Sequence, residues 1–457
     1  MTEIDTEASR REQGGRKSVL ERGMSLFADT KRGEGASALL LMLSVFLLLT
    51  AYYLLKTARE PLILEGGAEV KSYSTAAQAL LLIPVTYLYG RLAAKVGRIR
   101  LITIVTVVFA SNLVVFFGLH ALHVKIGIPF FLWVGVFNVT IVAQFWSFAA
   151  DVYTEEQGKR LFAILGVGST VGAVFGSVIA GRLIHPIGVY GLMLTAAGFL
   201  LCSLAITRLV DKRESARPTE EKKATSDKNA PLGKKGGFAL LFSDRYLFLI
   251  GALLFILNCV NTSGEYILDR TLVQHLKDTV PAGVDAHAWT EEQLGVFKAH
   301  YFLYVNTATV VLQLFAVSRV IKYLGVRAGL FIAPLISLVG YGTAFFFPVL
   351  GIVFAVKISE NTLDYSLQNT AKQALWLLTS RDDKYKAKNV VDSFIVRCGD
   401  FLSAGITFVG TALGFATRHF ILVNAGMVLA WLSIVVLLSR AHKRRESGSG
   451  GEQRPTG

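Results

Sequence analysis

The sequence predicts an all-α polytopic membrane protein, with twelve transmembrane helices in two six-helix bundles. Composition is the first reason: 53% of the 457 residues are hydrophobic and 18% are charged, whereas about 25% are charged in a typical soluble domain. The second reason is that apolar runs of about 20 residues, long enough to cross a bilayer as a helix, recur along nearly the whole chain. These runs also lack the alternation of a membrane β-barrel.

The helices are expected in two sets of six. The first set lies near residues 36–60, 73–96, 99–122, 127–152, 159–184 and 187–210. The second set lies near residues 244–274, 292–322, 326–347, 349–378, 387–415 and 418–440. Each range is a mostly apolar run, and most charged residues lie in the tails and in the short segments between the ranges.

This grouping divides the chain into five regions. Residues 1–35 are expected to be a disordered, basic cytosolic tail, because a long polar segment of mixed charge fits neither a cleavable signal nor a transit peptide. Residues 36–211 and 243–440 form the two bundles. Residues 212–242, rich in Lys, Glu, Ser, Pro and Gly, form a cytosolic linker, and residues 441–457 form a second cytosolic tail.

Positive charge gathers in alternate loops, which the positive-inside rule places in the cytosol. The basic residues of these loops are Arg91, Lys95, Arg98, Arg100, Lys159, Arg160, Arg319, Lys322, Arg327, Arg381, Lys384, Lys386 and Lys388. Both termini are therefore expected on the cytosolic side of a bacterial cytoplasmic membrane. Because this topology explains the net charge of +14, no nucleic-acid partner is expected. The expected partners are the lipid bilayer and a small anionic substrate, and the protein is expected to be monomeric.

The two halves also resemble each other in sequence. In the loop after the second helix of each half, Arg91 and Gly97 match Arg319 and Gly325 at identical spacing. Two parallel six-helix repeats, each with a basic, glycine-containing loop after its second helix, describe the major-facilitator architecture. The alternative is that basic loops at regular intervals reflect topology alone.

The first helix contains charged residues that are candidates for a substrate site. A charge inside a membrane helix is costly unless it faces a partner or water, so such residues usually mark a solute path. Tyr52, Lys56 and Arg59 follow i, i+4, i+7 spacing and therefore share one face. Both cations are expected to face a central cavity. Arg59 lies near the helix end, so the alternative is that it reaches lipid headgroups.

The tenth helix carries the longest polar stripe. Its members are Lys357, Glu360, Asp364, Gln368 and Lys372, at i, i+3, i+7, i+11 and i+15. These residues are expected to line the solute path. The alternative is a ladder of ion pairs that locks two helices together, and either arrangement places this helix against protein or water rather than lipid.

Three further helices carry candidate site residues. In the seventh helix, Glu265 is the deeper acid of a polar stripe that continues to Asp269. In the fourth, Asp151 approaches the cytosolic end, where it is either a site residue or an interfacial cap. In the eleventh, Arg397 is placed to pair with the polar stripe of the tenth helix.

Other kinds of site are not indicated. The sequence has no Gly-x4-Gly-Lys-Ser/Thr phosphate loop, which argues against ATP hydrolysis. The glycines Gly168, Gly172 and Gly176 follow no predicted strand, and their four-residue spacing favours close helix packing. The cysteines and histidines lack metal-ligand spacing, so no cofactor, metal or enzymatic activity is expected.

At these residues the chain resembles the ATP/ADP translocase family, the nucleotide transporters of plastids and obligate intracellular bacteria. The residues at positions that are functional in that family are Lys56, Arg59, Asp151, Glu265 and Lys372. Lys56 stands for an Arg of the family, Arg59 for a Lys and Asp151 for a Glu. The family's Phe-Asp-Pro-Cys-Lys-Glu is replaced by Gln-Asn-Thr-Ala-Lys-Gln at residues 368–373, with the loss of two acids. The resemblance covers most of both bundles.

The resemblance implies secondary-active transport, with exchange of nucleotides of the ATP/ADP type by alternating access between the bundles. Lys56, Arg59 and Lys372 are expected to hold the polyphosphate, and the two acids at family positions to balance these cations in the empty site. Tyr52 is one candidate for stacking the base. The second candidate function is a proton-coupled major-facilitator carrier of another anion, with the proton on an acid of the seventh or tenth helix. The third is a membrane scaffold whose charges are structural pairs.

Overall fold

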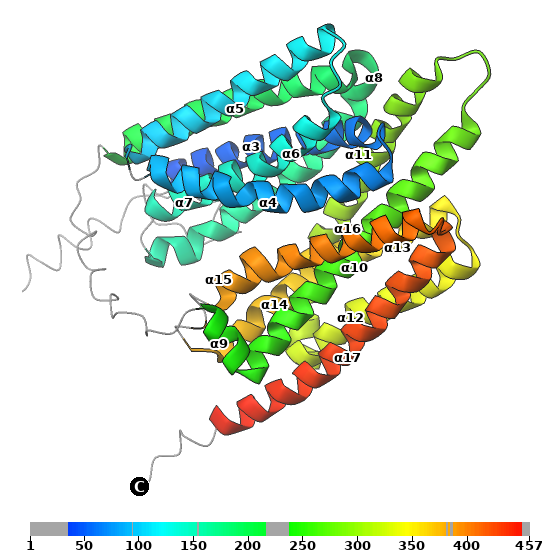
Figure 1. Ribbon diagram of the computed structural model, residues 1–457. Coiled ribbons are helices and arrows are strands. Elements are labelled where there is room, and N and C mark those ends of the chain that lie inside the picture. Colours follow the sequence, from blue (N-terminus) through cyan, green and yellow to red (C-terminus); the bar gives the residue numbers. More distant parts are fainter. Residues whose placement is uncertain are drawn as a thin grey trace, which may run out of the picture.

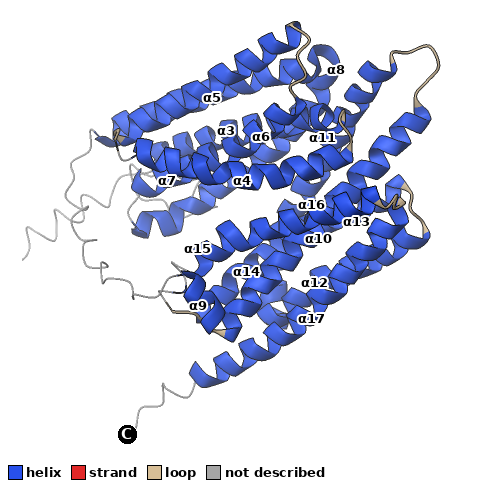
Figure 2. Cartoon of the chain, in the orientation of Figure 1, coloured by secondary structure: helices blue, strands red, loops and turns tan. Residues whose placement is uncertain are grey.

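The computed structural model describes residues 35–449, except 94, 153–154, 216–236, 381–382 and 384–386. Within this part the chain is helical and has no strand (Figure 2). Nine of the described helices are long and apolar enough to cross a membrane. The predicted all-helical, multi-pass character is therefore confirmed. The expected N-terminal tail, apart from Gly35, and most of the expected linker lie outside the described residues.

The first half of the chain forms one bundle. Its elements are α3 (Gly35–Leu64), α4 (Ala68–Ala93), α5 (Arg98–Ala121), α6 (Gly127–Phe137), the π-helical turn η1 (Asn138–Val142), α7 (Ala143–Val152) and α8 (Glu155–Ser215). α8 combines the fifth and sixth predicted helices, and its backbone leaves helical geometry at Gly188 (φ 66°, ψ 179°). Glycine enters this left-handed region without the steric penalty of a side chain, so the chain reverses there between two antiparallel helices.

The second half forms the other bundle. Its elements are α9 (Gly237–Ser243), α10 (Arg245–Thr279), α11 (Ala286–Leu312), η3 (Gln313–Val317), α12 (Ser318–Phe346), α13 (Leu350–Leu363), η4 (Asp364–Gln368), α14 (Asn369–Leu375), η5 (Trp376–Leu378), α15 (Lys388–Val390), η7 (Val391–Ile395), α16 (Val396–Ala412) and α17 (Thr417–Ser449). Gly325 (φ 79°, ψ 166°) divides α12 where the sequence predicts the boundary between the eighth and ninth helices. The predicted tenth helix is absent from the nine spans, and its sequence concentrates the charged residues Lys357, Glu360 and Asp364 within eight positions. A π-helical turn, η4, follows α13 in this segment.

Three helical segments extend past the bundle boundaries expected from the sequence. α8 continues to Ser215 and α9 begins at Gly237, both within the range expected for the linker. α17 runs beyond residue 440 to Ser449. The side chain of His442 explains this last extension, because it is 3% exposed and its Nδ1 lies 2.8 Å from the hydroxyl of Tyr246. Residues assigned by composition to a solvated tail thus pack against the second bundle.

The two bundles form separate groups of helices, with α3 to α8 in one and α10 to α17 in the other (Figure 1). They meet where α3, α4 and α8 contact α10, α11 and α16. Polar contacts in this zone include Ser72 Oγ to Thr407 Oγ1 at 3.2 Å and Lys71 Nζ to Asp269 Oδ2 at 2.6 Å. The zone lies toward the loops that join α3 to α4 and α10 to α11, away from the ends where α8 finishes and α9 begins.

Within the first bundle, α3 and α8 pack with their backbones close together. A Cβ atom at Gly168 would lie 2.6 Å from the carbonyl oxygen of Met42, and one at Gly176 would lie 2.7 Å from the carbonyl oxygen of Thr50. Both distances are shorter than real Cβ contacts allow. The prediction that these glycines serve helix packing is therefore confirmed.

Candidate substrate-binding cavity

A cavity of about 200 Å³ lies between the two bundles and is lined by polar and aromatic side chains. From the first half it is lined by Tyr53, Lys56, Arg59, Glu60, Lys71, Thr75, Gln78 and Phe131. From the second half it is lined by Asn261, Thr262, Glu265, Phe302, Val305, Asn306, Asn361 and Tyr365. Three of these residues are basic and two are acidic, so the wall carries an excess of positive charge.

Lys56 is the basic residue of the wall that an anion can reach without displacing a carboxylate. Its Nζ lies 4.3 Å from the ring centroid of Phe302 and 5.3 Å from that of Tyr53. Within the described part of the chain, no acidic side chain forms an ion pair with Lys56. Aromatic faces attract a cation by about 0.5–2 kcal/mol, less than a buried carboxylate would, so this ammonium group is incompletely compensated.

Arg59 lies one turn further along α3. Its Nε donates to Glu60 Oε1 at 3.0 Å, and its guanidinium carbon lies 4.7 Å from the ring centroid of Phe131. Because the side chain lines the cavity and is 15% exposed, it points into the protein in this conformation, whereas the alternative from the sequence had it reaching lipid headgroups. A stacked guanidinium is held in one orientation, and its planar array of donors matches the geometry of a phosphate.

Four charged side chains, called here the gate cluster, close the cavity on the side where the bundles meet. They are Glu60, Lys71, Asp269 and Lys298. Lys71 Nζ lies 2.5 Å from Glu60 and 2.6 Å from Asp269. Lys298 Nζ lies 3.3 Å from Glu60 and forms an ion pair with Asp269. Each lysine thus binds one carboxylate of its own half and one of the other, so the cluster ties the bundles together.

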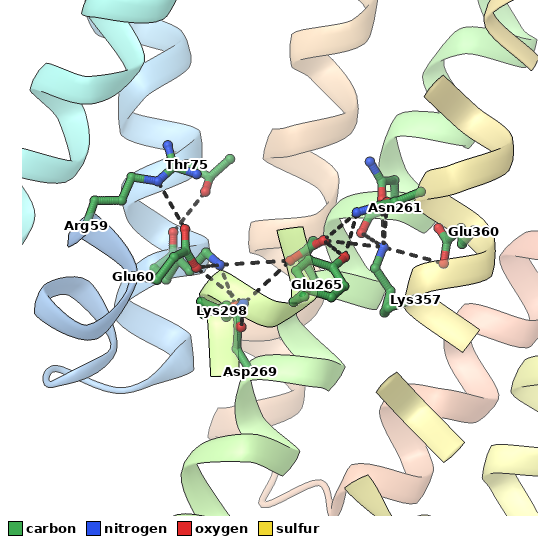
Figure 3. A network of polar contacts seen from close by, with 12 residues as sticks. Arg59, Glu60, Thr75, Asn261, Glu265, Asp269, Lys298, Lys357 and Glu360 are labelled. Atoms are coloured by element: carbon green, nitrogen blue, oxygen red, sulfur yellow. Dashed lines mark hydrogen bonds and ion pairs between the residues drawn. The ribbon is translucent and has the colours of Figure 1, made fainter. Parts of the chain in front are cut away.

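Glu265 links the gate cluster to a second buried pair (Figure 3). Its carboxylate accepts hydrogen bonds from Tyr301 at 2.8 Å and Asn361 at 3.0 Å, and it lies 3.8 Å from Lys357 Nζ. Lys357 donates to Asn261 Oδ1 at 2.6 Å. This carboxylate also lies within 4.0 Å of both lysines of the gate cluster, so the two groups of charges form one continuous network.

A further acid, Glu360, lies behind Lys357. It is 4% exposed, its Oε2 lies 3.5 Å from Lys357 Nζ, and it accepts a hydrogen bond from the hydroxyl of Tyr341 at 2.5 Å. Lys357 and Glu360 therefore occupy the second bundle next to the cavity, one layer behind its wall.

The candidate residues from the sequence are distributed as follows. Lys56, Arg59 and Glu265 line the cavity, and Lys357 and Glu360 contact Glu265 or its partners. Tyr52 stacks on Phe137 with ring centroids 6.3 Å apart. Its neighbour Tyr53, whose hydroxyl donates to Asn306 at 2.9 Å, lines the cavity instead.

The other candidates pair away from the cavity wall. Lys372 Nζ lies 2.9 Å from Asp364 within the same helical segment. Asp151 has an exposed side chain 3.6 Å from Arg98. Arg397 lies 3.2 Å from Asp400 of its own helix, and pairs with no residue of α13, η4 or α14 in the contacts described. For these residues a role in substrate binding stays a prediction.

Sequence reasoning missed the two lysines of the gate cluster. Lys71 precedes residue 73, where the second helix was expected to begin, but α4 already begins at Ala68. Lys298 lies inside the predicted eighth helix and is fully buried. A lysine two turns into an apolar helix is the same signal that singled out Lys56, so Lys298 was detectable from the sequence, whereas Lys71 was not.

Comparison with known proteins places this arrangement in context. A family model described as Major Facilitator Superfamily matches residues 36–359. Among curated proteins, ADP,ATP carrier protein 1 of Chlamydia trachomatis is 23% identical over 349 residues, which are 66% of this chain and 62% of the relative. The same-named protein of Chlamydia muridarum is 22% identical over the same shares. The match thus spans less than two thirds of these relatives, whose names agree with the resemblance noted in the sequence.

Solved structures confirm the fold. The POT family transporter PepTSo superposes with a TM-score of 0.61 at 13% identity, covering 90% of this chain and 98% of the other. A bacterial homologue of the human lysosomal transporter Spinster, inward-facing and unoccupied, gives a TM-score of 0.58 at 16% identity over 91% and 99%. The nucleoside transporter NupG gives 0.58 at 11% identity over 90% and 98%. At such identities the likeness concerns the fold.

Proposed function

Because this chain belongs to the Major Facilitator Superfamily, we propose that it is a secondary-active transporter that exchanges nucleotides by ATP/ADP-type antiport. It acts as a monomer in a bacterial cytoplasmic membrane with both termini in the cytosol. The observation that carries this proposal is the excess of positive charge in a cavity between the bundles, with Lys56 facing aromatic rings and no carboxylate. The names of the chlamydial relatives point to the same substrate class.

The phosphate groups of the nucleotide bind at Lys56 and Arg59. Charge-assisted hydrogen bonds to phosphate are about twice as strong as neutral ones, and a guanidinium contacts two phosphate oxygens at once. The base stacks on an aromatic side chain of the wall, for which Tyr53, Phe302 and Tyr365 are placed. A phosphate of the bound nucleotide pairs with the ammonium group of Lys56, and this ion pair is the source of the affinity.

The cavity volume makes binding depend on movement of the bundles. Pockets for drug-sized ligands usually measure about 300–1,000 Å³, and this cavity of about 200 Å³ holds the phosphate part but not a whole nucleotide. The bundles must therefore separate around the cavity as the nucleotide enters, as alternating access requires.

The gate cluster explains why the protein exchanges one nucleotide for another and does not release a nucleotide without a counter-substrate. Opening the contact zone separates Lys71 from Asp269 and Lys298 from Glu60, and breaking a buried ion pair costs about 3–5 kcal/mol. Lys71 also lines the cavity, so a bound phosphate replaces Asp269 as its partner. The loaded protein therefore changes conformation more readily than the empty one, which couples export of one nucleotide to import of another.

Exchange in proteoliposomes tests this proposal. Vesicles preloaded with radiolabelled ADP should release it rapidly when ATP or ADP is present outside, and slowly into buffer alone. Equal release under both conditions would contradict exchange. No release under either condition, together with no thermal stabilisation of the purified protein by any nucleotide, would remove nucleotides as the substrate.

A second candidate is a proton-coupled carrier of another anion. It is favoured by Glu360, a buried carboxyl that contacts both Lys357 and Tyr341 next to the cavity. In this case uptake of the anion should collapse when an uncoupler dissipates the proton gradient, and Glu360→Gln should make uptake independent of pH. Nucleotide exchange that persists with the uncoupler would exclude this candidate.

A further inference from the structure

Amide side chains line the cavity between the bundles at four positions, which are Gln78, Asn261, Asn306 and Asn361. The three asparagines already bond to neighbouring side chains. The Oδ1 atoms of Asn261 and Asn306 accept hydrogen bonds from a lysine and a tyrosine at 2.6 and 2.9 Å. The Nδ2 of Asn361 donates to Glu265 at 3.0 Å. Gln78 differs from them, because its amide forms no hydrogen bond with the described part of the chain.

The place of the Gln78 amide depends on a glycine of the same bundle. α6 packs against α4, and a Cβ atom at Gly135 would lie 2.0 Å from Gln78 Cδ and 2.1 Å from its Oε1. Real Cβ atoms do not approach other atoms so closely, so the carboxamide occupies space that only a glycine leaves open. Gln78 is half-buried there and still lines the cavity, so its donor and acceptor are available to a solute.

Gln78 lies on the side of the wall away from the gate cluster. On α4, Lys71, Thr75 and Gln78 follow i, i+4, i+7 spacing and share one face, and all three line the cavity. Seven residues at about 1.5 Å each separate Lys71 from Gln78 by about 10 Å along the helix axis. Because the gate cluster closes the other side, a nucleotide with its phosphates at Lys56 and Arg59 extends its base in the direction of Gln78.

Hydrogen bonds along the edge of a base distinguish one base from another. Stacking on an aromatic side chain does so only weakly, because every base has a π-face. An amide presents a donor and an acceptor side by side, and this pair matches the N6 donor and the N7 acceptor of adenine. Guanine presents two acceptors, O6 and N7, at the same edge, so an amide oxygen placed there would meet a lone pair.

Building on the proposed function, which places a nucleotide in this cavity, we propose that the Gln78 carboxamide binds the edge of adenine and makes the protein prefer adenine over guanine nucleotides. Lys56 and Arg59 bind the phosphates of either nucleotide alike, so they supply affinity without selecting the base. Gly135 positions the amide. Because α4 and α6 belong to the same bundle, the amide keeps this position when the two bundles separate.

Isothermal titration calorimetry of the purified full-length protein with ATP, GTP and inorganic tripolyphosphate tests this assignment. The wild-type protein should bind ATP more tightly than GTP. Gln78→Leu, which keeps a side chain of similar size, should weaken ATP binding about five- to hundredfold, the range for one bidentate contact to a base. GTP binding should weaken much less, and tripolyphosphate, which has no base, should bind as it does to the wild type.

Gly135→Ala tests the position of the amide without removing it. The new Cβ displaces the end of a flexible side chain, so the melting temperature should be no lower than that of the wild type, while the preference for ATP over GTP should fall as in Gln78→Leu. The matched control is Gly118→Ala on α5, where a Cβ would meet no atom within 4 Å. This control should keep the wild-type preference.

Three outcomes would overturn the assignment while leaving nucleotide exchange intact. Equal affinity of the wild-type protein for ATP and GTP would remove the selectivity that Gln78 is assigned. An unchanged ratio of the two affinities in Gln78→Leu would show that another group selects the base. A parallel loss of ATP and tripolyphosphate affinity would show that this side chain only maintains the shape of the site. In contrast, a wild-type protein that binds tripolyphosphate but neither nucleotide would contradict the proposed function itself, and the assignment with it.

Discussion

Lys56 and Glu60, a member of the gate cluster, lie about one turn apart on α3, but the charges around them are compensated in opposite ways. The gate cluster has two lysines and two carboxylates, each within 3.3 Å of a partner of opposite charge. Lys56 has aromatic rings at 4.3 and 5.3 Å instead. A balanced buried cluster holds two pieces of protein together, whereas an unbalanced buried cation is stabilised by an anion that arrives from outside. The difference separates the residues that close the transporter from those that bind its substrate.

The largest expected effect comes from unbalancing the gate cluster. Asp269→Asn leaves Lys71 and Lys298 sharing Glu60 as their close carboxylate, with Glu265 more distant at 3.9–4.0 Å, and should lower the free energy of unfolding by about 3–5 kcal/mol. Denaturant unfolding in detergent measures this change. Adding Lys298→Met restores the charge balance and should recover most of the loss. If Asp269→Asn alone had wild-type stability, this would show that the cluster does not join the bundles.

Lys56→Met, in contrast to Asp269→Asn, should change stability little and nucleotide affinity strongly. Stability should change by about 1 kcal/mol or less, because only contacts with aromatic rings are lost. Affinity for nucleotide should fall about ten- to hundredfold, because a charge-assisted hydrogen bond of about 1.5–3 kcal/mol is lost. Ligand-induced shifts in melting temperature measure both effects. Lys125→Met, at an exposed lysine outside the cavity, is the matched control, and an equal loss of affinity there would refute the assignment of Lys56.

Lys372→Met sharpens the comparison further. Its ammonium group is already compensated by Asp364 at 2.9 Å, so it resembles the gate lysines more than Lys56. Nucleotide affinity should fall less than tenfold, a loss below about 1.4 kcal/mol. The same melting-temperature titration decides the matter. A loss as large as that of Lys56→Met would show that this lysine changes partners when substrate binds.

The smallest effect is expected for an exposed ion pair in the same contact zone. Glu65 lies 3.3 Å from both Lys125 and His287, and all three side chains are at least 36% exposed. Glu65→Gln should cost less than about 1 kcal/mol of unfolding free energy, because solvent already screens these charges. If it cost as much as Asp269→Asn, burial would not be what distinguishes the gate cluster.

The fold was predictable from local properties of the sequence. Apolar runs predicted the order of the helices. The reversal at Gly325 falls between two predicted helices, and that at Gly188 falls at the second residue of the predicted sixth helix. The interruption at η4 was not predictable, because a π-helical turn leaves no mark in hydropathy. Periodicity also placed Lys56 and Arg59 on one face of a helix, and both line the cavity.

The composition of the candidate site was only partly predictable. Periodicity identifies the face of a helix that carries charge, but it does not identify the helix opposite. The pairing of Lys298 with Glu60 and Asp269 joins residues far apart in the chain and depends on how the bundles dock. Asp151 and Lys372 satisfy the same sequence criteria as Lys56, yet each forms an ion pair with a nearby residue. A sequence pattern alone does not show whether such a residue pairs within the protein or binds substrate.

The close packing of α3 on α8 has a mechanical consequence. With glycines set against its backbone along several turns, α3 cannot slide or roll by itself, so it tilts only together with its bundle. This helix carries both Lys56 and Glu60 in its last third. A tilt that pulls Glu60 away from Lys298 also shifts Lys56 relative to Phe302. Substrate binding at Lys56 and opening of the gate cluster at Glu60 are therefore mechanically coupled, because both residues move with the same helix.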